Sequence, residues 1–474
     1  MSRWVALLPE YVLALTGLAV FAALMARGER RAARARVAAM TGAVLLLAST
    51  AVTLGAAAEF FRATYRVDAF SQLVKLAVAL GFVLALFVTR DATGQRDDVR
   101  GETFFFLLTS TAGLVVMASA VELLSLYLAL EIASFSLFVL VPLRAMKATG
   151  KEAGLKFLIV GLGASAVTLF GLSILIGLTG STMVYGIGAA AAVQARYAVA
   201  LLGLALFAAG FLFKLALFPF HFWAPDVYQE ASHGVASFVA TASKVAAVAI
   251  LARLFALGGF AGAHLAIALA VVAFLSMSLG NLVAITQRDV KRMLAYSAVA
   301  QAGYIVVGIV AMSRDGLAAA LVYGVLYVIM NAAAFLVVAR VGADGSNPSL
   351  DDLRGLHRRS PLLAATLLLA LFALAGVPPT AGFAGKWLLF RAAMGEGWWW
   401  LVVGAAVNST ISVYYYLVAI KHAYLLPAEQ ERPVTLSWGD KAACYALSAA
   451  LIVFGVWPAQ LLAWSERAAA ALLP

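Results

Sequence analysis

The sequence predicts an all-α polytopic membrane protein of about fourteen transmembrane helices, two of them broken, arranged as two inverted five-helix repeats. Of the 474 residues, 64% are hydrophobic and only 12% are charged, against roughly 45–50% and 25% in a soluble domain. The mean hydropathy is +0.97. Apolar stretches repeatedly exceed the ~18 residues that mark a membrane helix. They are continuous Leu, Ala, Val and Phe runs, which excludes the alternating strands of a membrane β-barrel.

Composition also excludes several functional classes. Cys444 is the only cysteine, so neither a disulfide framework nor a thiolate metal site is expected. The net charge is +11, but a nucleic-acid-binding surface would cluster its basic residues on a folded domain. Here the basic residues lie in short loops between apolar runs, and we expect no nucleic-acid partner.

Fourteen spans are predicted in order along the chain. They are Trp4–Met25, Ala38–Ala58, Ala69–Thr89, Thr103–Ala120, Leu123–Leu143, Leu155–Thr179, Ala198–Val227, Gly234–Leu257, Ala261–Ile285, Met293–Met312, Gly316–Val341, Pro361–Met394, Trp398–Lys421 and Ala443–Trp464. Each is justified by the length of its apolar run.

The seventh and twelfth spans are too long for one straight crossing. They hold 30 and 34 residues, or roughly 45 and 51 Å of helix, against a hydrocarbon core of about 30 Å. Pro219 and Pro225 lie in the seventh span, and Pro378 and Pro379 in the twelfth. Because proline removes a helical hydrogen bond, we expect both spans to break inside the protein.

The distribution of Lys and Arg predicts the orientation. Loops that follow odd-numbered spans carry 22 of the 34 basic residues, against 8 in the termini and the other loops, and four lysines lie within spans. By the positive-inside rule the odd loops face the cytoplasm and both termini face outward. This requires an even number of spans.

Buried charges are the candidate functional residues, because an ionisable group at the bilayer centre costs about 2.5–3.5 kcal/mol on insertion scales. Lys244 lies ten residues into its span and Glu131 eight residues into its own, which places both near mid-depth. Lys214 and Lys386 lie close to the two expected breaks, where free backbone groups and water favour ion sites. Changes in the pairing of such charges could load or release a proton.

Several of these residues also allow a purely structural interpretation. Lys75 lies only six residues into its span, and we expect it to snorkel to the interface. Glu131 and the lysines could instead form static ion pairs that fix helix packing. His221 stands in an aromatic run, and its spacing alone favours a structural, interfacial role.

Weak internal symmetry suggests a division of the chain. A long broken span is fourth in the set of five that begins with the fourth span, and again in the set that begins with the ninth. A repeat displaced by an odd number of spans is inverted in the membrane, as in ion-coupled transporters. The predicted units are residues 1–102, 103–257, 258–424 and 425–474.

Four stretches resemble one family, the antiporter-like membrane subunits of respiratory complex I (NADH-quinone oxidoreductase), with the subunit N branch nearest. They are residues 213–229 (FKLALFPFHFWAPDVYQ), 122–131 (ELLSLYLALE), 287–297 (QRDVKRMLAYS) and 378–387 (PPTAGFAGKW). The ending PDVYQ is the feature closest to subunit N. The resemblance runs from the first predicted span to the last.

The resemblance implies roles for six residues. Glu131 and Lys214 would form a modulating ion pair, Lys244 would be the central proton carrier, and Lys386 would exchange the proton in the broken twelfth span. Further, weaker matches are Lys156, a polar residue of the sixth span, and His221, a histidine on the axis that links the carriers. The family pattern is lost after Gln229, where this chain reads EASHGVA, and we expect this to alter an outward loop and the exit path.

The resemblance therefore implies a proton-translocating subunit of NADH:quinone oxidoreductase in a bacterial inner membrane. Redox chemistry is not expected on this chain, because it has no dinucleotide fingerprint in a strand–helix context and no cysteines for an iron–sulfur cluster. NADH, FMN, iron–sulfur clusters and quinone would lie in partner subunits of the complex. Two alternatives are a subunit of a multisubunit cation/proton antiporter or membrane-bound hydrogenase, which shares this helix core, and a membrane scaffold that transports nothing.

Overall fold

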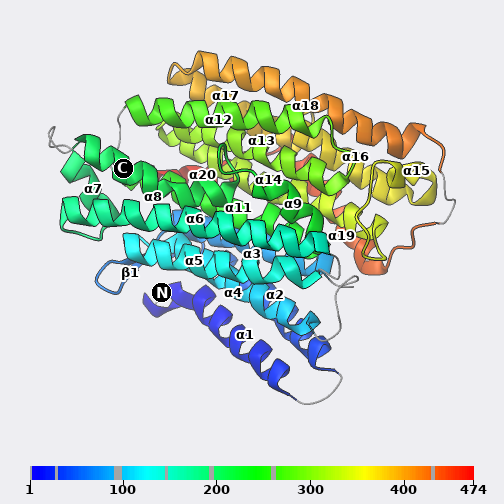
Figure 1. Cartoon of the computed structure of the whole chain (residues 1–474), viewed down its shortest axis with the longest axis horizontal. Helices are drawn as coiled ribbons and strands as arrows, with labels where there is room; N and C mark the ends of the chain where they lie inside the picture. Colours follow the sequence, from blue (N-terminus) through cyan, green and yellow to red (C-terminus); the bar gives the residue numbers. More distant parts are fainter. Residues whose placement is uncertain are drawn as a thin grey trace.

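The computed structural model describes residues 3–26, 30–89, 99–144, 148–191, 197–257, 263–428 and 433–473. The chain is a bundle of helices that run roughly side by side along its longest axis (Figure 1). In these residues thirteen helices are long and apolar enough to cross a membrane. Together with the broken twelfth span they correspond to the fourteen predicted spans, and the all-α membrane fold is confirmed.

The long elements follow the predicted order. They are α1 (Leu8–Met25), α2 (Arg31–Val52), α3 (Ala69–Val88), α4 (Arg100–Ser119), α5 (Leu123–Leu140), α6 (Ala148–Thr179), α8 (Tyr197–Leu215), α10 (His233–Ala240), α11 (Ala242–Leu257), α12 (Ala263–Ala284), α13 (Val290–Val310), α14 (Arg314–Val341), α16 (Pro361–Ala375), α17 (Ala381–Gly395), α18 (Trp399–Leu425) and α19 (Trp438–Val456). The short elements are η1 (Arg3–Leu7), β1 (Ala58–Phe60), β2 (Tyr65–Val67), η3 (Val141–Arg144), α7 (Val184–Ala191), α9 (Trp223–Glu230), η5 (Asp351–Leu353), α15 (Leu356–Arg359) and α20 (Ala459–Ala470).

Local sequence explains where key helices begin and end. Asp68 caps α3, since its side chain accepts a hydrogen bond from the Ser71 amide at 2.7 Å and the Ser71 hydroxyl accepts one from the Asp68 amide at 2.9 Å. At the end of α16, Gly376 has φ +86°, which only glycine adopts without steric cost. At Gly382 in α17 a Cβ would overlap the Ala373 carbonyl, so this glycine lets α17 approach α16.

Both long spans break, as predicted. The seventh ends as α8 and resumes as α9, and the twelfth is divided into α16 and α17. Each interruption contains a cis peptide bond, Phe218–Pro219 in one and Pro378–Pro379 in the other.

Two further breaks were not predicted. The eighth span is interrupted at Thr241, which separates α10 from α11. The last predicted span, Ala443–Trp464, is wrong at both ends, because α19 begins at Trp438 and ends at Val456, and Pro458 precedes the separate helix α20. The second span is also misplaced, since α2 covers Arg31–Val52 and the chain then enters the β1–β2 hairpin.

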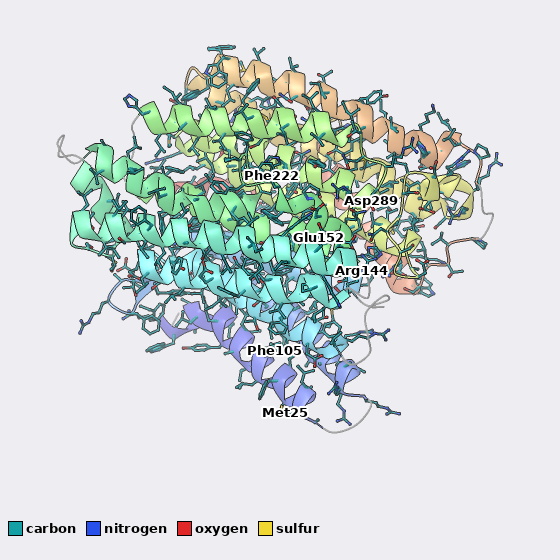
Figure 2. All side chains as sticks on the ribbon, in the orientation of Figure 1. Met25, Phe105, Arg144, Glu152, Phe222 and Asp289 are labelled. Atoms are coloured by element: carbon teal, nitrogen blue, oxygen red, sulfur yellow. The ribbon has the colours of Figure 1, made fainter. Side chains whose placement is uncertain are left out.

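The loops gather at two ends according to their parity. Loops after the second, fourth and sixth spans meet through bridges that join Tyr65 to Ala120 and Glu122 to Met183. Figure 1 places both termini toward the end that carries β1 and α7. Described residues beside the loops after the fifth, ninth and eleventh spans meet at the other end, where Figure 2 shows Arg144 and Asp289. The even number of spans therefore agrees with the structure.

Burial separates the inner helices from the outer ones. In the described chain the most apolar windows of α10–α11, α13 and α14 are 94% buried or more, whereas those of α1, α6 and α19 are at most 33% buried. The inner helices include α11, which bears Lys244, and α13, whose Tyr304 ring contacts Lys386. The predicted division into units of residues 1–102, 103–257, 258–424 and 425–474 stays a prediction. One of its boundaries, residue 258, lies outside the described residues, as do Arg27 of the first predicted loop and Pro474 at the end of the sequence.

Candidate functional site

Lys214 lies at the end of α8, where the seventh span breaks. Its side chain is buried, and its Nζ donates a hydrogen bond to the Ser134 hydroxyl of α5 at 3.1 Å. Glu131 lies one turn before Ser134 and accepts a hydrogen bond from the Ser165 hydroxyl of α6. Among the described residues no Glu131 oxygen lies within 4.0 Å of Lys214 Nζ. The implied Glu131–Lys214 pair is therefore not a direct contact; Lys214 is bonded to Ser134, which lies one turn after Glu131 on the same helix.

A small cavity continues from Lys214 toward the eighth span. Its volume is about 10 Å³, which is room for about one water molecule. The lining residues are Ser134, Leu137, Phe157, Phe213, Lys214, Trp223, Val239 and Ser243. Because Ser243 precedes Lys244, this cavity links the surroundings of the two lysines.

Lys244 lies at the start of α11, just after the break at Thr241. It is 1% exposed, and its Nζ donates a hydrogen bond to the Ala298 carbonyl of α13 at 2.8 Å. In the described part of the chain no carboxylate lies within 4.0 Å of this ammonium. Lys244 is thus buried in the core of the bundle without an anionic partner.

Lys386 in α17 faces the broken end of α16. Its Nζ lies 3.1 Å from the Leu374 carbonyl oxygen, 3.0 Å from that of Ala375 and 2.9 Å from the Ser409 hydroxyl. It also lies 4.3 Å from the centre of the Tyr304 ring. The last carbonyls of a helix have no intrahelical partner and carry partial negative charge. The break therefore supplies neutral acceptors for the lysine.

A buried polar network connects the surroundings of Lys386 and Lys244. The Gln301 amide donates a hydrogen bond to the Leu374 carbonyl at 2.8 Å, the same oxygen that accepts from Lys386. Gln301 also accepts a hydrogen bond from the Tyr323 hydroxyl at 2.5 Å and lies 3.4 Å from the Tyr416 hydroxyl.

The network ends beside the carbonyl that holds Lys244. The Tyr416 hydroxyl lies 2.5 Å from that of Ser297, which directly precedes Ala298. The sequence analysis missed these residues. A signal was present: Ser297, Gln301 and Tyr304 are polar residues at the i, i+4 and i+7 spacing of one helix face within an apolar span.

The two weaker candidates lie away from this axis. Lys156 is exposed on α6 and pairs with Glu152 at 2.8 Å and with Asp226 at 3.4 Å. His221 lies in the break between α8 and α9, buried against the rings of Phe218 and Phe222. Within the described residues neither side chain contacts Lys214, Lys244 or Lys386.

The atypical segment after Gln229 lies at the opposite end of the bundle from the termini. Arg144 donates to the Ala231 carbonyl at 2.9 Å, and Lys291 donates to the same oxygen at 2.7 Å. Both cations also reach the Asn347 side chain. The prediction that this segment forms an outward loop and the prediction that both termini face outward therefore exclude each other. The effect of the segment on the exit path stays a prediction.

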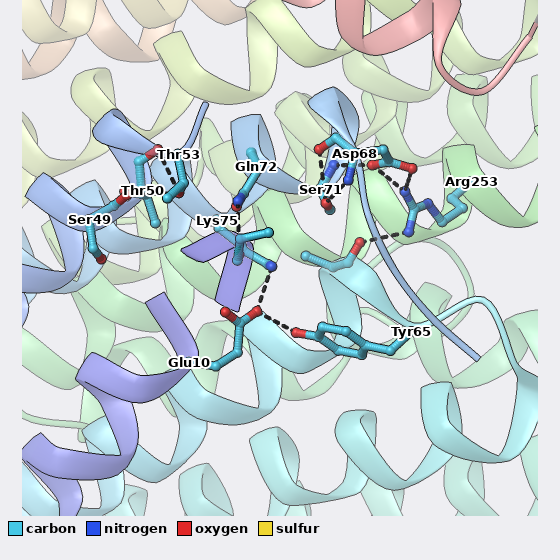
Figure 3. Close-up of polar contacts among 12 residues, drawn as sticks. Glu10, Ser49, Thr50, Thr53, Tyr65, Asp68, Ser71, Gln72, Lys75 and Arg253 are labelled. Atoms are coloured by element: carbon cyan, nitrogen blue, oxygen red, sulfur yellow. Dashed lines mark hydrogen bonds and ion pairs between the residues drawn. The ribbon is translucent and has the colours of Figure 1, made fainter. Parts of the chain in front are cut away.

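Lys75 does not snorkel. It is fully buried, and its Nζ lies 2.6 Å from Glu10 of α1, which also accepts a hydrogen bond from the Tyr65 hydroxyl at 2.5 Å (Figure 3). Arg253, which lies within the predicted eighth span, is likewise fully buried and pairs with Asp68 at 2.5 Å. Among the described residues no group of three or more His, Cys, Asp or Glu could hold a metal ion.

Comparisons with known proteins agree on one family. Residues 120–412 match the family described as NADH:quinone oxidoreductase/Mrp antiporter, transmembrane. A protein of Syntrophobacter fumaroxidans named NADH-quinone oxidoreductase subunit N 2 is 42% identical over 472 residues, which cover 99% of this chain and all of that protein.

Solved structures show the same fold. A chain of respiratory complex I from Thermus thermophilus superposes with a TM-score of 0.84 at 33% identity, over 96% of this chain and 98% of that one. A chain of the Mrp complex from a Dietzia species gives a TM-score of 0.88 at 22% identity, over all of this chain and 98% of that one. At that identity the second match shows the fold alone.

Proposed function

Since the chain belongs to the family of NADH:quinone oxidoreductase and Mrp antiporter membrane subunits, we propose that its buried lysines carry protons across a bacterial inner membrane. Within this family it is a subunit of NADH-quinone oxidoreductase of the subunit N type. The antiporter alternative is not favoured, because the Mrp chain shares only 22% identity. The other membrane subunits of the complex are its partners, with the lipid bilayer around them.

One observation supports the carrier role most directly. Polar groups lead from Lys386 through the Leu374 carbonyl, Gln301 and Tyr416 to Ser297, next to the carbonyl that holds Lys244. The small cavity beside Lys214 is lined by Ser243, the residue before Lys244. The hydroxyls of Tyr416 and Ser297 both donate and accept hydrogen bonds and can relay a proton, whereas the Leu374 carbonyl only accepts and the Gln301 amide orients its neighbours. In this proposal water carries the proton over the parts of the path without hydroxyls.

The partners of these lysines suit a group that changes its charge. Within the described chain the hydrogen bonds of the Lys244 and Lys386 ammonium groups go to carbonyl and hydroxyl oxygens. A neutral amine still donates to such oxygens, whereas a lysine in a buried ion pair would leave an uncompensated anion on losing its proton. In this proposal Glu131 modulates Lys214, Lys244 is the central carrier and Lys386 exchanges the proton. His221, buried in the break, and Lys156, at the surface, are implied by the resemblance alone and are given no step in this proposal.

Electron transfer is assigned to partner subunits in this proposal. The single cysteine, Cys444, cannot ligate an iron–sulfur cluster. NADH, FMN, the clusters and quinone would bind elsewhere in the complex. The free energy of quinone reduction would reach this chain through electrostatic and conformational coupling along the line of charges.

We propose that both termini lie on the periplasmic side. The support is the excess of Lys and Arg in the loops at the other end of the bundle. A cysteine added at the C-terminus should react with a membrane-impermeant thiol reagent from outside, while one placed among the arginines at the start of α2 should not. The native Cys444 is buried and serves as the background. Labelling of the α2 position alone would invert the orientation.

The proposal is tested at Lys244 by proton translocation in sealed vesicles that contain the assembled complex, with NADH oxidation measured in parallel. Lys244→Ala and Lys244→Arg should both lower the number of protons moved per NADH. Arginine keeps the positive charge but does not release its proton. A scaffold would tolerate arginine, because the charge and its hydrogen bonds persist. Near-normal translocation by an assembled Lys244→Arg complex would contradict the carrier role.

A further inference from the structure

Arg253 is the second cation of α11, the helix that begins two residues before Lys244. These two are the only charged residues of α11. Arg253 is 0% exposed, and its Nη2 donates to both carboxylate oxygens of Asp68, at 2.7 and 2.5 Å (Figure 3). Its Nη1 donates to the Ala118 carbonyl of α4 at 2.9 Å, and its guanidinium lies 4.7 Å from the centre of the Phe70 ring.

These contacts join the far end of α11 to the N-terminal helices. Asp68 is the N-cap of α3, and its side chain is fixed in turn by the Ser71 amide. Ala118 lies in the last turn of α4. One guanidinium nitrogen is held by the Asp68 carboxylate and the other by the Ala118 carbonyl, so the planar group is restrained in both position and direction. Arg253 is therefore bound to two helices that carry none of the proposed proton carriers.

The near end of α11 is not a continuous helix. Thr241 has φ −111° and ψ −89° and separates α11 from α10. Helical backbone bonds still run through Thr241, whose N–H donates to the Ser237 carbonyl at 3.0 Å and whose carbonyl accepts from the Val245 N–H at 3.1 Å. The Lys244 N–H also donates to the Thr241 carbonyl, at 3.1 Å, so the helix is irregular next to this lysine. Lys244 precedes Arg253 by nine residues, or about 13.5 Å along the axis, and the bonds of Arg253 hold the regular part of α11 to the neighbouring helices.

We propose that Arg253 is a positioning residue for Lys244: its bonds to Asp68 and to the Ala118 carbonyl fix the depth and rotation of α11. This inference rests on the proposed carrier role of Lys244. Stability alone does not account for the pair, because well-packed apolar residues replace buried ion pairs at no loss of stability in many proteins. A shift of α11 would displace Lys244 Nζ from the Ala298 carbonyl and would move Ser243 away from the cavity beside Lys214.

The test compares three variants of the assembled complex in sealed vesicles. Arg253→Lys keeps the charge but loses the planar fork and its three hydrogen bonds. Asp68→Asn keeps the helix cap and one acceptor but removes the charge. Arg340→Lys is the matched control, since Arg340 is also a buried arginine, 2.8 Å from Asp440, but lies on α14, which bears none of the carriers.

Arg253→Lys and Asp68→Asn should each lower the protons moved per NADH by at least about half of the loss caused by Lys244→Ala, because misplacement of a reacting group by 1 Å costs large factors in rate. The pH profile of translocation should also shift, which a loss of assembled complex would not produce. The double variant should be no worse than the worse single variant. Arg340→Lys should keep the parent ratio.

Each outcome separates the two proposals. A parent ratio and an unshifted pH profile in Arg253→Lys, with Lys244→Ala deficient, would overturn the positioning role alone. An equal loss in Arg340→Lys would also overturn it, because any buried arginine pair would then suffice. If Arg253→Lys fails to assemble, Asp68→Asn decides by the same two measurements. A parent ratio in Lys244→Ala would overturn the carrier role itself.

Discussion

The protein holds buried cations in two opposite ways. Around the N-terminal helices, Lys75 lies 2.6 Å from Glu10 and Arg253 lies 2.5 Å from Asp68. In the central axis, Lys244 and Lys386 are also buried, but in the described chain their hydrogen bonds go to carbonyl and hydroxyl oxygens and to no carboxylate. Burial is therefore common to both regions, and the presence of an anion distinguishes them.

The difference separates fixed charges from exchangeable ones. A cation beside a buried carboxylate is held in its charged form, because the neutral form would strand the anion in an apolar medium. A cation among neutral oxygens loses no anionic partner when it gives up its proton, and its hydrogen bonds survive. The N-terminal charges thus suit a structural role and the central ones a transport role. This contrast can be tested by adding an anion beside a central lysine and by removing one from an N-terminal pair.

The largest effect is expected when a central lysine is given an anion. Ser409 lies 2.9 Å from Lys386 Nζ, so Ser409→Asp places a carboxylate beside it. An ion pair that favours the charged form by only about 1.4 kcal/mol slows proton release about tenfold. Proton translocation per NADH in sealed vesicles should fall at least to the level of a Lys386→Ala variant.

Ser409→Ala is the matched control for that experiment. It removes one hydrogen bond and adds no charge, and the Leu374 and Ala375 carbonyls still hold Lys386. We expect it to retain most of the translocation. Equal loss in Ser409→Ala and Ser409→Asp would show that the hydroxyl, rather than the absence of an anion, is what Lys386 requires.

A somewhat smaller effect is expected when the network between the lysines is interrupted. Gln301→Leu keeps the size of the side chain but removes its bonds to the Leu374 carbonyl and to Tyr323. We expect translocation to fall by about tenfold, because each lost buried hydrogen bond costs on the order of 1 kcal/mol and the tyrosine hydroxyl loses its acceptor. The measurement is proton uptake at a matched rate of NADH oxidation.

Asn331→Leu serves as the control for Gln301. It removes another buried amide, on the neighbouring helix α14, which donates a hydrogen bond to the Tyr327 carbonyl of the same helix at 3.2 Å. Translocation should remain near the parent value. A comparable loss of translocation in this variant would mean that removal of any buried amide of the core impairs transport, and the effect of Gln301→Leu could not be assigned to the network.

The opposite change, removal of an anion from an N-terminal pair, should affect stability rather than transport. Glu10→Gln leaves Lys75 buried without a carboxylate, and we expect about 1–3 kcal/mol of destabilisation, since Glu10 retains some contact with solvent. Thermal unfolding or the yield of assembled complex measures this loss. The protons moved per NADH should not change in the complex that assembles.

A double variant shows whether the Lys75 charge is responsible. Lys75→Met combined with Glu10→Gln removes both charges and should recover most of the lost stability, because an apolar replacement of a buried pair is often neutral. If the double variant is no more stable than Glu10→Gln, the loss comes from the missing bond of Glu10 to Tyr65 instead of the unpaired lysine.

The sequence predicted the spans and the two proline breaks well because both depend on local chemistry. Run length sets a span, and paired prolines such as Pro378 and Pro379 remove helical hydrogen bonds wherever they stand. The break at Thr241 has no such local cause. It lies in the most buried span of the described chain, where packing against neighbouring helices overrides the helical preference of the surrounding residues.

Which charges are paired could not be predicted from the sequence. Lys75 was expected at the interface because its partner, Glu10, lies 65 positions away on another helix. Arg253 and Asp68 are 185 positions apart. Depth along one span follows from residue counting, whereas the side chain that faces a charge depends on how the helices pack. For the same reason the direct Glu131–Lys214 contact was expected and is absent.

The smallest effect is expected at Lys156, which tests whether the resemblance alone assigns a role correctly. Lys156 is exposed and pairs with Glu152 and Asp226. Surface ion pairs of this kind contribute little, because water and salt screen them. Lys156→Ala should therefore leave translocation per NADH close to the parent value, while Lys244→Ala in the same preparation does not. Deficient translocation by an assembled Lys156→Ala complex would show that a surface charge takes part in proton transfer, and the contrast between fixed and exchangeable charges would have to include the entrance of the pathway.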